Sequence, residues 1–168
     1  MHRQRSGFTL TEMLVTISIV GILAAISTAS LQPLLQRQRL AQAAQQVEQA
    51  IRKTQQTAIT RAQQIYIEFD SDSYTLGSGN PCTVPRSILA TERLPIQIQI
   101  NLAVPGGSTL NTGGCPPALK PLVLFDFQGM TRMNDAGKFV RLNSSSLAGI
   151  NYDVYLLSIL GDVGTAKP

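Results

Sequence analysis

The sequence predicts an α+β fold in which one long N-terminal helix packs on an antiparallel β-sheet. A stretch of 24 residues from Phe8 to Leu31 contains a single charged side chain, Glu12. Helical spacing of apolar residues continues to about Gln63, and runs that alternate apolar and polar residues follow it. One helix followed by strands with short connections is typical of an α+β domain with antiparallel pairing.

The segment from Phe8 to Leu31 forms the first half of the predicted helix. About 20 consecutive apolar residues suffice for a helix to cross a bilayer. Arg3 and Arg5 precede this segment, and basic residues favour the cytoplasmic side of a membrane. The sequence therefore predicts a cytoplasmic leader at 1–7, a transmembrane helix at 8–31, and a domain outside the cytoplasm.

Glu12 is the one residue that does not suit this apolar segment. A carboxylate inside a membrane helix costs roughly 2.5–3.5 kcal/mol on insertion scales, and such groups usually have a partner. No basic side chain follows within two helical turns. Cleavage before Phe8 would create an α-amino group about one turn away, and that amine on a neighbouring subunit could pair with Glu12.

The residues around Gly7 carry a resemblance to a known family. Arg5-Ser-Gly7 followed by Phe8-Thr-Leu-Thr-Glu12-Met-Leu-Val resembles the class III signal of type IV pilins and type II secretion pseudopilins. In that family a prepilin peptidase cuts after the glycine and N-methylates the new N-terminal phenylalanine. The resemblance implies cleavage between Gly7 and Phe8, N-methylation of Phe8, and an assembly role for Glu12.

Later segments are similar to the GspH/FimT group of minor pilins and pseudopilins. These segments are Leu34 to Leu40, Arg61 to Phe69 and Val123 to Gly129. The resemblance implies a pilin-like subunit of a type IV pilus or type II secretion pseudopilus. It also implies three partners: the peptidase, an inner-membrane assembly platform, and other pilins that bind through the N-terminal helix. The globular domain is then periplasmic, and no cofactor is expected.

A secretory signal peptide is the main alternative for the N-terminus. Ser27-Thr-Ala29 has the small residues of a cleavage site, and cutting there would give a soluble protein that begins near Ser30. The apolar segment is longer than the 7–15 residues usual in such signals. This alternative also leaves Glu12 and the Gly7-Phe8 pair without a role.

The second half of the predicted helix, residues 32–63, is amphipathic. Pro33 lies inside it and is expected to bend it, because proline lacks an N–H and crowds the preceding turn. Apolar or small residues recur on one face that should pack on the sheet. This stripe consists of Leu40, Ala44, Val47, Ile51, Thr54, Ala58 and Ala62.

Residues 64–168 are predicted to form the β-rich globular domain. Two Gly- and Pro-rich loops, 77–85 and 105–121, interrupt the strand pattern. The first two predicted strands form a hairpin across residues 71–73. The predicted strands are Ile65 to Asp70, Tyr74 to Leu76, Ile96 to Leu102, Leu122 to Phe127, Phe139 to Leu142 and Tyr152 to Leu160.

The chain has two cysteines, Cys82 and Cys115, one in each of these loops. In an exported domain they can form one disulfide. It would close a loop of about 33 residues and stabilise the fold by roughly 3–4 kcal/mol. Free reactive thiols are the alternative.

Candidate catalytic and metal-binding residues are few. The only histidine, His2, lies in the predicted leader, which argues against histidine-based catalysis and most zinc sites. Asp70 and Asp72 flank a predicted turn and could hold Ca²⁺, although solvated aspartates are common in turns. We expect a protein that assembles and is not an enzyme.

DNA binding is the second functional hypothesis, because some FimT-like minor pilins take up DNA through basic residues near the end of the chain. Here the last ten residues contain one lysine and one aspartate. Three basic residues near a glycine-rich turn, Arg132, Lys138 and Arg141, are the candidate phosphate contacts.

Overall fold

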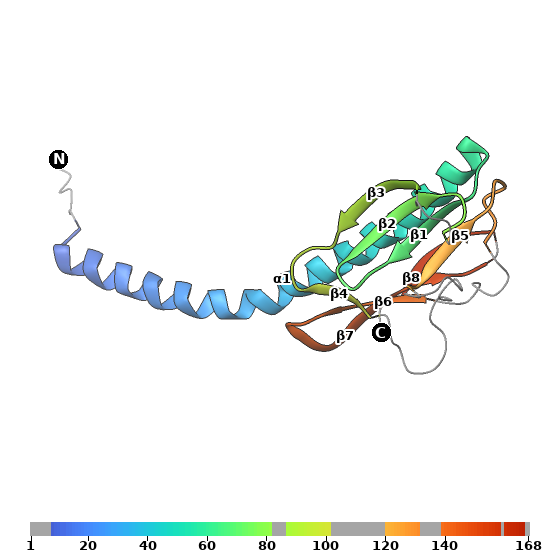
Figure 1. Cartoon of the computed structure of the whole chain (residues 1–168). Coiled ribbons are helices and arrows are strands. Elements are labelled where there is room, and N and C mark those ends of the chain that lie inside the picture. The colour runs from blue at the N-terminus through green and yellow to red at the C-terminus, as the bar shows by residue number, and fades with distance from the viewer. Residues whose placement is uncertain (1–7, 82–86, 102–119, 132–138, 159, 167–168) are drawn as a thin grey trace. The chain divides into compact units, whose positions relative to one another are not determined.

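A computed structural model describes residues 8–81, 87–101, 120–131, 139–158 and 160–166. The chain divides into two compact units between Leu35 and Gln36. The first unit is helical. The second contains the rest of the helix and every strand (Figure 1).

Helix α1 runs from Leu10 to Arg61. The predicted single long helix is thus confirmed, but it is shorter by two residues at each end than the predicted range 8–63. It continues through Pro33. The bend expected there lies next to the boundary between the two units and stays a prediction.

Ala62 ends α1 in the left-handed conformation, with φ of 49°. The Gln63 N–H donates to the Ala58 carbonyl and the Ala62 N–H to the Ile59 carbonyl, both at 3.2 Å. This pair of bonds is a Schellman motif, which satisfies carbonyls that the helix end would otherwise leave free. Ala62 is therefore exposed, and its predicted place on the buried stripe is wrong.

The strands form two antiparallel four-stranded sheets, whereas the sequence analysis expected one sheet. The first has the order β3-β2-β1-β5, with β1 Ile65–Phe69, β2 Ser73–Ser78, β3 Ser87–Arg93 and β5 Leu122–Phe125. The second has the order β4-β6-β7-β8, with β4 Ile98–Asn101, β6 Phe139–Ser144, β7 Leu147–Leu156 and β8 Val163–Ala166.

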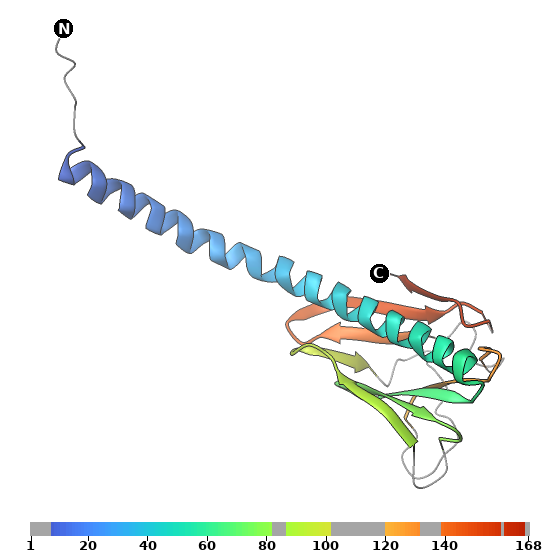
Figure 2. The ribbon, with the colours of Figure 1, turned by 90° about the horizontal axis from the view of Figure 1, so that it is seen from above.

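The second half of α1 lies along both sheets and shares one core with them (Figure 2). The rest of the predicted stripe is confirmed, because its members from Leu40 to Ala58 are all buried. Ala43 and Ala50 are buried beside them. Facing them are side chains of both sheets, including Phe69, Phe125, Leu142 and Val154.

Gln55, on α1, forms hydrogen bonds with two loops. Its Nε2 donates to the Gly129 carbonyl at 3.0 Å and to the Leu160 carbonyl at 2.5 Å. A Cβ at Gly161 would lie 2.4 Å from this nitrogen, so the close approach requires glycine. The turns after β5 and β7 are thereby held at one end of the second unit.

The predicted strands are confirmed with shifts at their ends. The β1–β2 hairpin has the expected register, with Phe69 opposite Tyr74. Ile96 is exposed because a turn at Pro95 and a positive φ at Gln97 delay β4 until Ile98. β7 starts and ends earlier than predicted, at Leu147 and Leu156.

Two strands, β3 and β8, were not predicted. The residues of β3 show no burial alternation because nearly all of them are exposed. β8, Val-Gly-Thr-Ala, is short and has one buried residue, Val163. Gly77, predicted to start a loop, lies in β2, where a Cβ would meet the Tyr66 ring at 2.2 Å.

Replacing Ile51 by Ala should lower the free energy of unfolding by about 2–5 kcal/mol, because Ile51 is fully buried between α1 and the sheets. Urea unfolding of the full chain in detergent measures the loss. Ile59→Ala is the matched control on the same helix, since Ile59 is 50 % exposed, and it should change stability by about 0.5 kcal/mol or less. Equal losses in the two variants would contradict the packing described here.

Candidate functional site

The start of α1 is built around Thr9 and Glu12. Thr9 precedes the first helical residue, Leu10, and is therefore the N-cap, which makes Glu12 the third helical residue. The Thr9 N–H and hydroxyl both donate to Oε2 of Glu12 at 3.0 Å, and the Glu12 N–H donates to the Thr9 hydroxyl at 3.3 Å. These reciprocal bonds form a capping box, which satisfies otherwise free amides of the first turn.

The capping box gives Glu12 a partner in its own chain, which the sequence analysis missed. The signal was the Thr9-x-x-Glu12 spacing, a known signature of helix starts. The bonds reach only Oε2. Among the described residues, no hydrogen bond to Oε1 of Glu12 is formed.

Large apolar side chains surround Glu12, and each is more than half exposed in its own unit. They occupy ten of the 16 positions from 8 to 23 and are spread around the whole circumference of the helix rather than along one stripe. An exposed apolar surface of this extent marks an interaction site. The residues are Phe8, Leu10, Met13, Leu14, Val15, Ile17, Ile19, Val20, Ile22 and Leu23.

Among the described residues, no helix combines the length and the hydropathy of a candidate membrane span.

Several predicted site residues lie outside the described residues: Gly7, Cys82, Cys115, Arg132 and Lys138. Glu12 lies in the first turn of α1, Phe8 lies two residues before this helix begins, and Arg141 lies on β6. The structure therefore groups the predicted processing and assembly residues Phe8 and Glu12.

Arg141 is held in an ion pair with Asp153, directly opposite it on β7. Its Nε donates to Oδ1 and a terminal nitrogen to Oδ2, both at 2.7 Å. The guanidinium also lies 5.1 Å from the centre of the Phe139 ring. The hydrogen bonds to Asp153 raise the pKa of Arg141 above its usual value, and they leave its charge locally neutralised.

The two aspartates near the first hairpin also have protein partners. Asp70 accepts a bond of 2.5 Å from Lys120 Nζ and one of 2.8 Å from the Ser71 N–H. Lys120, and then Ser71, lower the pKa of Asp70. Asp72 accepts from the Ser73 hydroxyl at 3.1 Å.

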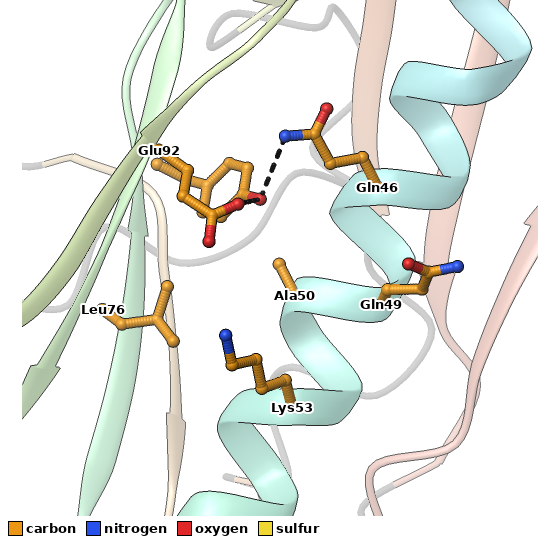
Figure 3. Close-up of a pocket in the computed structure, with 7 residues that line it drawn as sticks. Gln46, Gln49, Ala50, Lys53, Leu76 and Glu92 are labelled. Atoms are coloured by element: carbon orange, nitrogen blue, oxygen red, sulfur yellow. Dashed lines mark hydrogen bonds between the residues drawn. The ribbon is translucent and has the colours of Figure 1, made fainter.

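A pocket of about 150 Å³ lies between α1 and the first sheet (Figure 3). The Tyr74 hydroxyl donates to Glu92 at 2.5 Å and accepts from Gln46 Nε2 at 3.3 Å. Burial, and then the bond to Glu92, raise the pKa of Tyr74. The phenol therefore stays protonated at neutral pH, and it links β2 to β3 as a hydrogen-bond donor and to α1 as an acceptor.

Comparison with known proteins identifies the class of the first unit. A family model described as the prokaryotic N-terminal methylation motif matches residues 2–28. The competence protein ComGD of Bacillus subtilis (strain 168) is 38 % identical over 77 residues, which are 46 % of this chain and 54 % of ComGD. The match thus spans about half the length of that relative.

Most of the chain aligns with a solved structure. The type IV minor pilin FimU of Pseudomonas aeruginosa (strain PAO1) aligns with a TM-score of 0.57 at 10 % identity, over 81 % of this chain and 97 % of FimU. A second crystal form of FimU gives a TM-score of 0.53 at 9 % identity, over 77 % and 97 %. At 9–10 % sequence identity, this structural similarity to FimU establishes the fold alone.

The chain carries the N-terminal methylation motif and has a type IV pilin-like fold.

The methylation motif covers both residues that the structure groups at the start of α1, Phe8 and Glu12. The exposed apolar surface lies within the same stretch. The candidate functional site is therefore the first part of α1, from Phe8 to Leu23.

Replacing Arg141 by Gln should lower the free energy of unfolding by about 1–3 kcal/mol, because Asp153 is only 7 % exposed and would lose its charged partner. Removing both charges, in Arg141→Gln with Asp153→Asn, should restore part of the loss. Urea unfolding measures both effects. Arg93→Gln, on the exposed strand β3, is the control, and an equal effect in the control would refute a stabilising role for the pair.

Proposed function

We propose that the chain is a minor pilin or pseudopilin subunit of the GspH/FimT type. A prepilin peptidase cuts it between Gly7 and Phe8 and N-methylates Phe8, and the subunit assembles into a type IV pilus or a type II secretion pseudopilus. The observation that carries the proposal is the exposed apolar helix with one capped carboxylate, which lies within the matched methylation motif.

Before assembly, residues 8–31 anchor the precursor in the inner membrane, with residues 1–7 in the cytoplasm and the globular domain in the periplasm. Arg3 and Arg5 favour this orientation. Lipid covers the apolar side chains from Leu10 to Leu23 that the chain itself leaves exposed. Removing each square ångström of apolar surface from water is favourable by roughly 25 cal/mol. The helix can therefore leave the membrane only for an equally apolar environment.

Other pilin helices supply that environment in the assembled filament. Cleavage exposes the Phe8 amine of one subunit, and Glu12 of a neighbour receives it. Since Thr9 bonds only to Oε2, the other oxygen of Glu12 can accept this amine without opening the capping box. The ion pair then aligns neighbouring helices in apolar surroundings, where Coulomb attraction is strong.

The role is structural, and its partners are the prepilin peptidase, other pilins and the inner-membrane assembly platform. A disulfide between Cys82 and Cys115 remains a prediction for the domain outside the cytoplasm. Asp70 and Asp72 bind protein donors, which fits an ordinary turn better than the Ca²⁺ alternative.

A role in DNA uptake is the second candidate, because the relative ComGD is named a competence protein. Arg141 is already bound to Asp153, so a DNA contact there would compete with an existing ion pair. Arg132 and Lys138 therefore carry this hypothesis.

Glu12→Ala should reduce incorporation into sheared filaments by about tenfold or more, because it removes the proposed ion pair with the Phe8 amine. A loss of about 1.4 kcal/mol in the free energy of subunit binding lowers the affinity tenfold. The measurement is the ratio of filament to membrane protein in immunoblots from the native host. Thr16→Ala, one turn further along the same exposed helix face, is the control and should assemble normally. Normal incorporation of Glu12→Ala would refute the role given to this carboxylate.

If DNA is bound, the full chain in detergent should bind duplex DNA more weakly as salt rises, because phosphate contacts release counterions. Arg132→Gln with Lys138→Gln should lower the affinity and the salt dependence. Arg141 is kept intact, so that a loss of binding does not reflect loss of the pair with Asp153. Binding that is absent at low salt would eliminate this candidate.

A further inference from the structure

Strand β3, Ser87–Arg93, is an edge strand that the described part of the molecule leaves open. Its hydrogen-bonded neighbour is β2, and six of its seven residues are exposed. Ile88 is 60 % exposed and Leu89 36 % exposed. A long exposed edge with apolar side chains is a template for another strand, and proteins usually cover or disrupt such edges.

The pairing with β2 shows which backbone groups of β3 point outward. The Leu94 N–H donates to the Asp72 carbonyl at 2.9 Å, which makes these opposite residues a hydrogen-bonded pair. Hydrogen-bonded and non-hydrogen-bonded pairs alternate in antiparallel sheets. Following the register, Glu92 and Ala90 bond to β2, whereas Thr91 and Arg93 do not.

Thr91 and Arg93 therefore direct their N–H and C=O groups away from β2. The hydroxyls of Thr91 and Thr75, 3.2 Å apart, agree with this, since side chains lie closer in non-hydrogen-bonded pairs. Within the described residues, the outward groups of Thr91 and Arg93 have no backbone hydrogen bond.

The other three sheet edges are partly closed by the chain itself. On β4, the Ile100 N–H donates to the Ser71 carbonyl at 2.8 Å. On β5, Phe125 forms a bridge with Thr131. On β8, Arg52 donates to the Val163 carbonyl at 2.6 Å. β3 is thus the open edge of the described sheets.

We propose that β3 accepts an extended strand from a different pilin-like subunit, which adds to the first sheet by β-augmentation. The inference rests on the proposed function, since it requires assembly with other pilins. Main-chain bonds to Thr91 and Arg93 give affinity, and apolar side chains of the incoming strand pack on Ile88 and Leu89.

The occupant is a different subunit because every other edge of the described sheets is already partly closed by the chain itself. Head-to-tail assembly of identical copies needs two different complementary surfaces on each copy, and each of the other described edges already has part of its outward backbone bonded. Pairing of β3 with β3 of a second copy would relate the two chains by a two-fold axis and close a dimer instead of extending a filament.

Photo-crosslinking of the full chain in its native host tests the proposal. A photoreactive residue replaces Leu89, and mass spectrometry identifies the partner. The chain with the photoreactive residue alone should give an adduct with another pilin-like subunit. Adding Thr91→Pro should reduce the adduct at least tenfold, because proline removes the outward N–H and obstructs an added strand. Adding Thr91→Ala should retain the adduct, since it loses the same hydroxyl but keeps the N–H.

The fold and the proposed function are measured in the same variants. Thr91→Pro should keep a cooperative urea transition, since its N–H does not bond to β2. A normal adduct with Thr91→Pro, no adduct at all, or an adduct only with a second copy would each overturn the β3 proposal. These outcomes leave the proposed function intact if the Thr91→Ala protein is still processed at Phe8 and recovered in filaments.

Discussion

An apolar helical surface that its own unit leaves uncovered is the constraint on which the rest of the molecule depends. Between Phe8 and Leu23 the large apolar side chains point in every direction around α1 and are more than half exposed. Contact of such a surface with water is unfavourable in proportion to its area. Lipid before assembly and neighbouring helices after it are the two environments that our proposal provides.

Glu12 is compatible with that surface because the capping box satisfies part of its hydrogen-bonding capacity. Thr9 supplies two donors to one carboxylate oxygen, so the carboxylate also completes the first turn of the helix. In our proposal the other oxygen, Oε1, accepts a hydrogen bond from the Phe8 amine of a neighbouring subunit. In our proposal the same residue thus stabilises the helix start in each subunit and aligns subunits with one another.

The sequence predicted the helix and the first hairpin well, because both have strong periodic burial. The stripe from Leu40 to Ala58 and the β1–β2 register depend on local patterns that tertiary contacts reinforce. β3 escaped prediction because an exposed edge strand has no buried face to impose alternation. Ile96 was misassigned because the positive φ at Gln97, set by the turn at Pro95, outweighs its apolar character.

The candidate site was predicted in part, for equally physical reasons. A residue motif predicted roles for Gly7, Phe8 and Glu12. It did not predict the capping bonds from Thr9, because they require the helix to begin at Leu10 and not at Phe8. The ion pair of Arg141 joins strands β6 and β7, and its partner was not anticipated. Pairing of this kind depends on register, which single residues do not reveal.

The mass of the mature N-terminus, measured on protein from the native host, tests the central claim most directly. The account predicts a chain that begins at Phe8 and carries one extra methyl group on its α-amine, with the apolar helix intact. A chain that begins near Ser30 would contradict it, because the helix and Glu12 would then have been removed with a secretory signal.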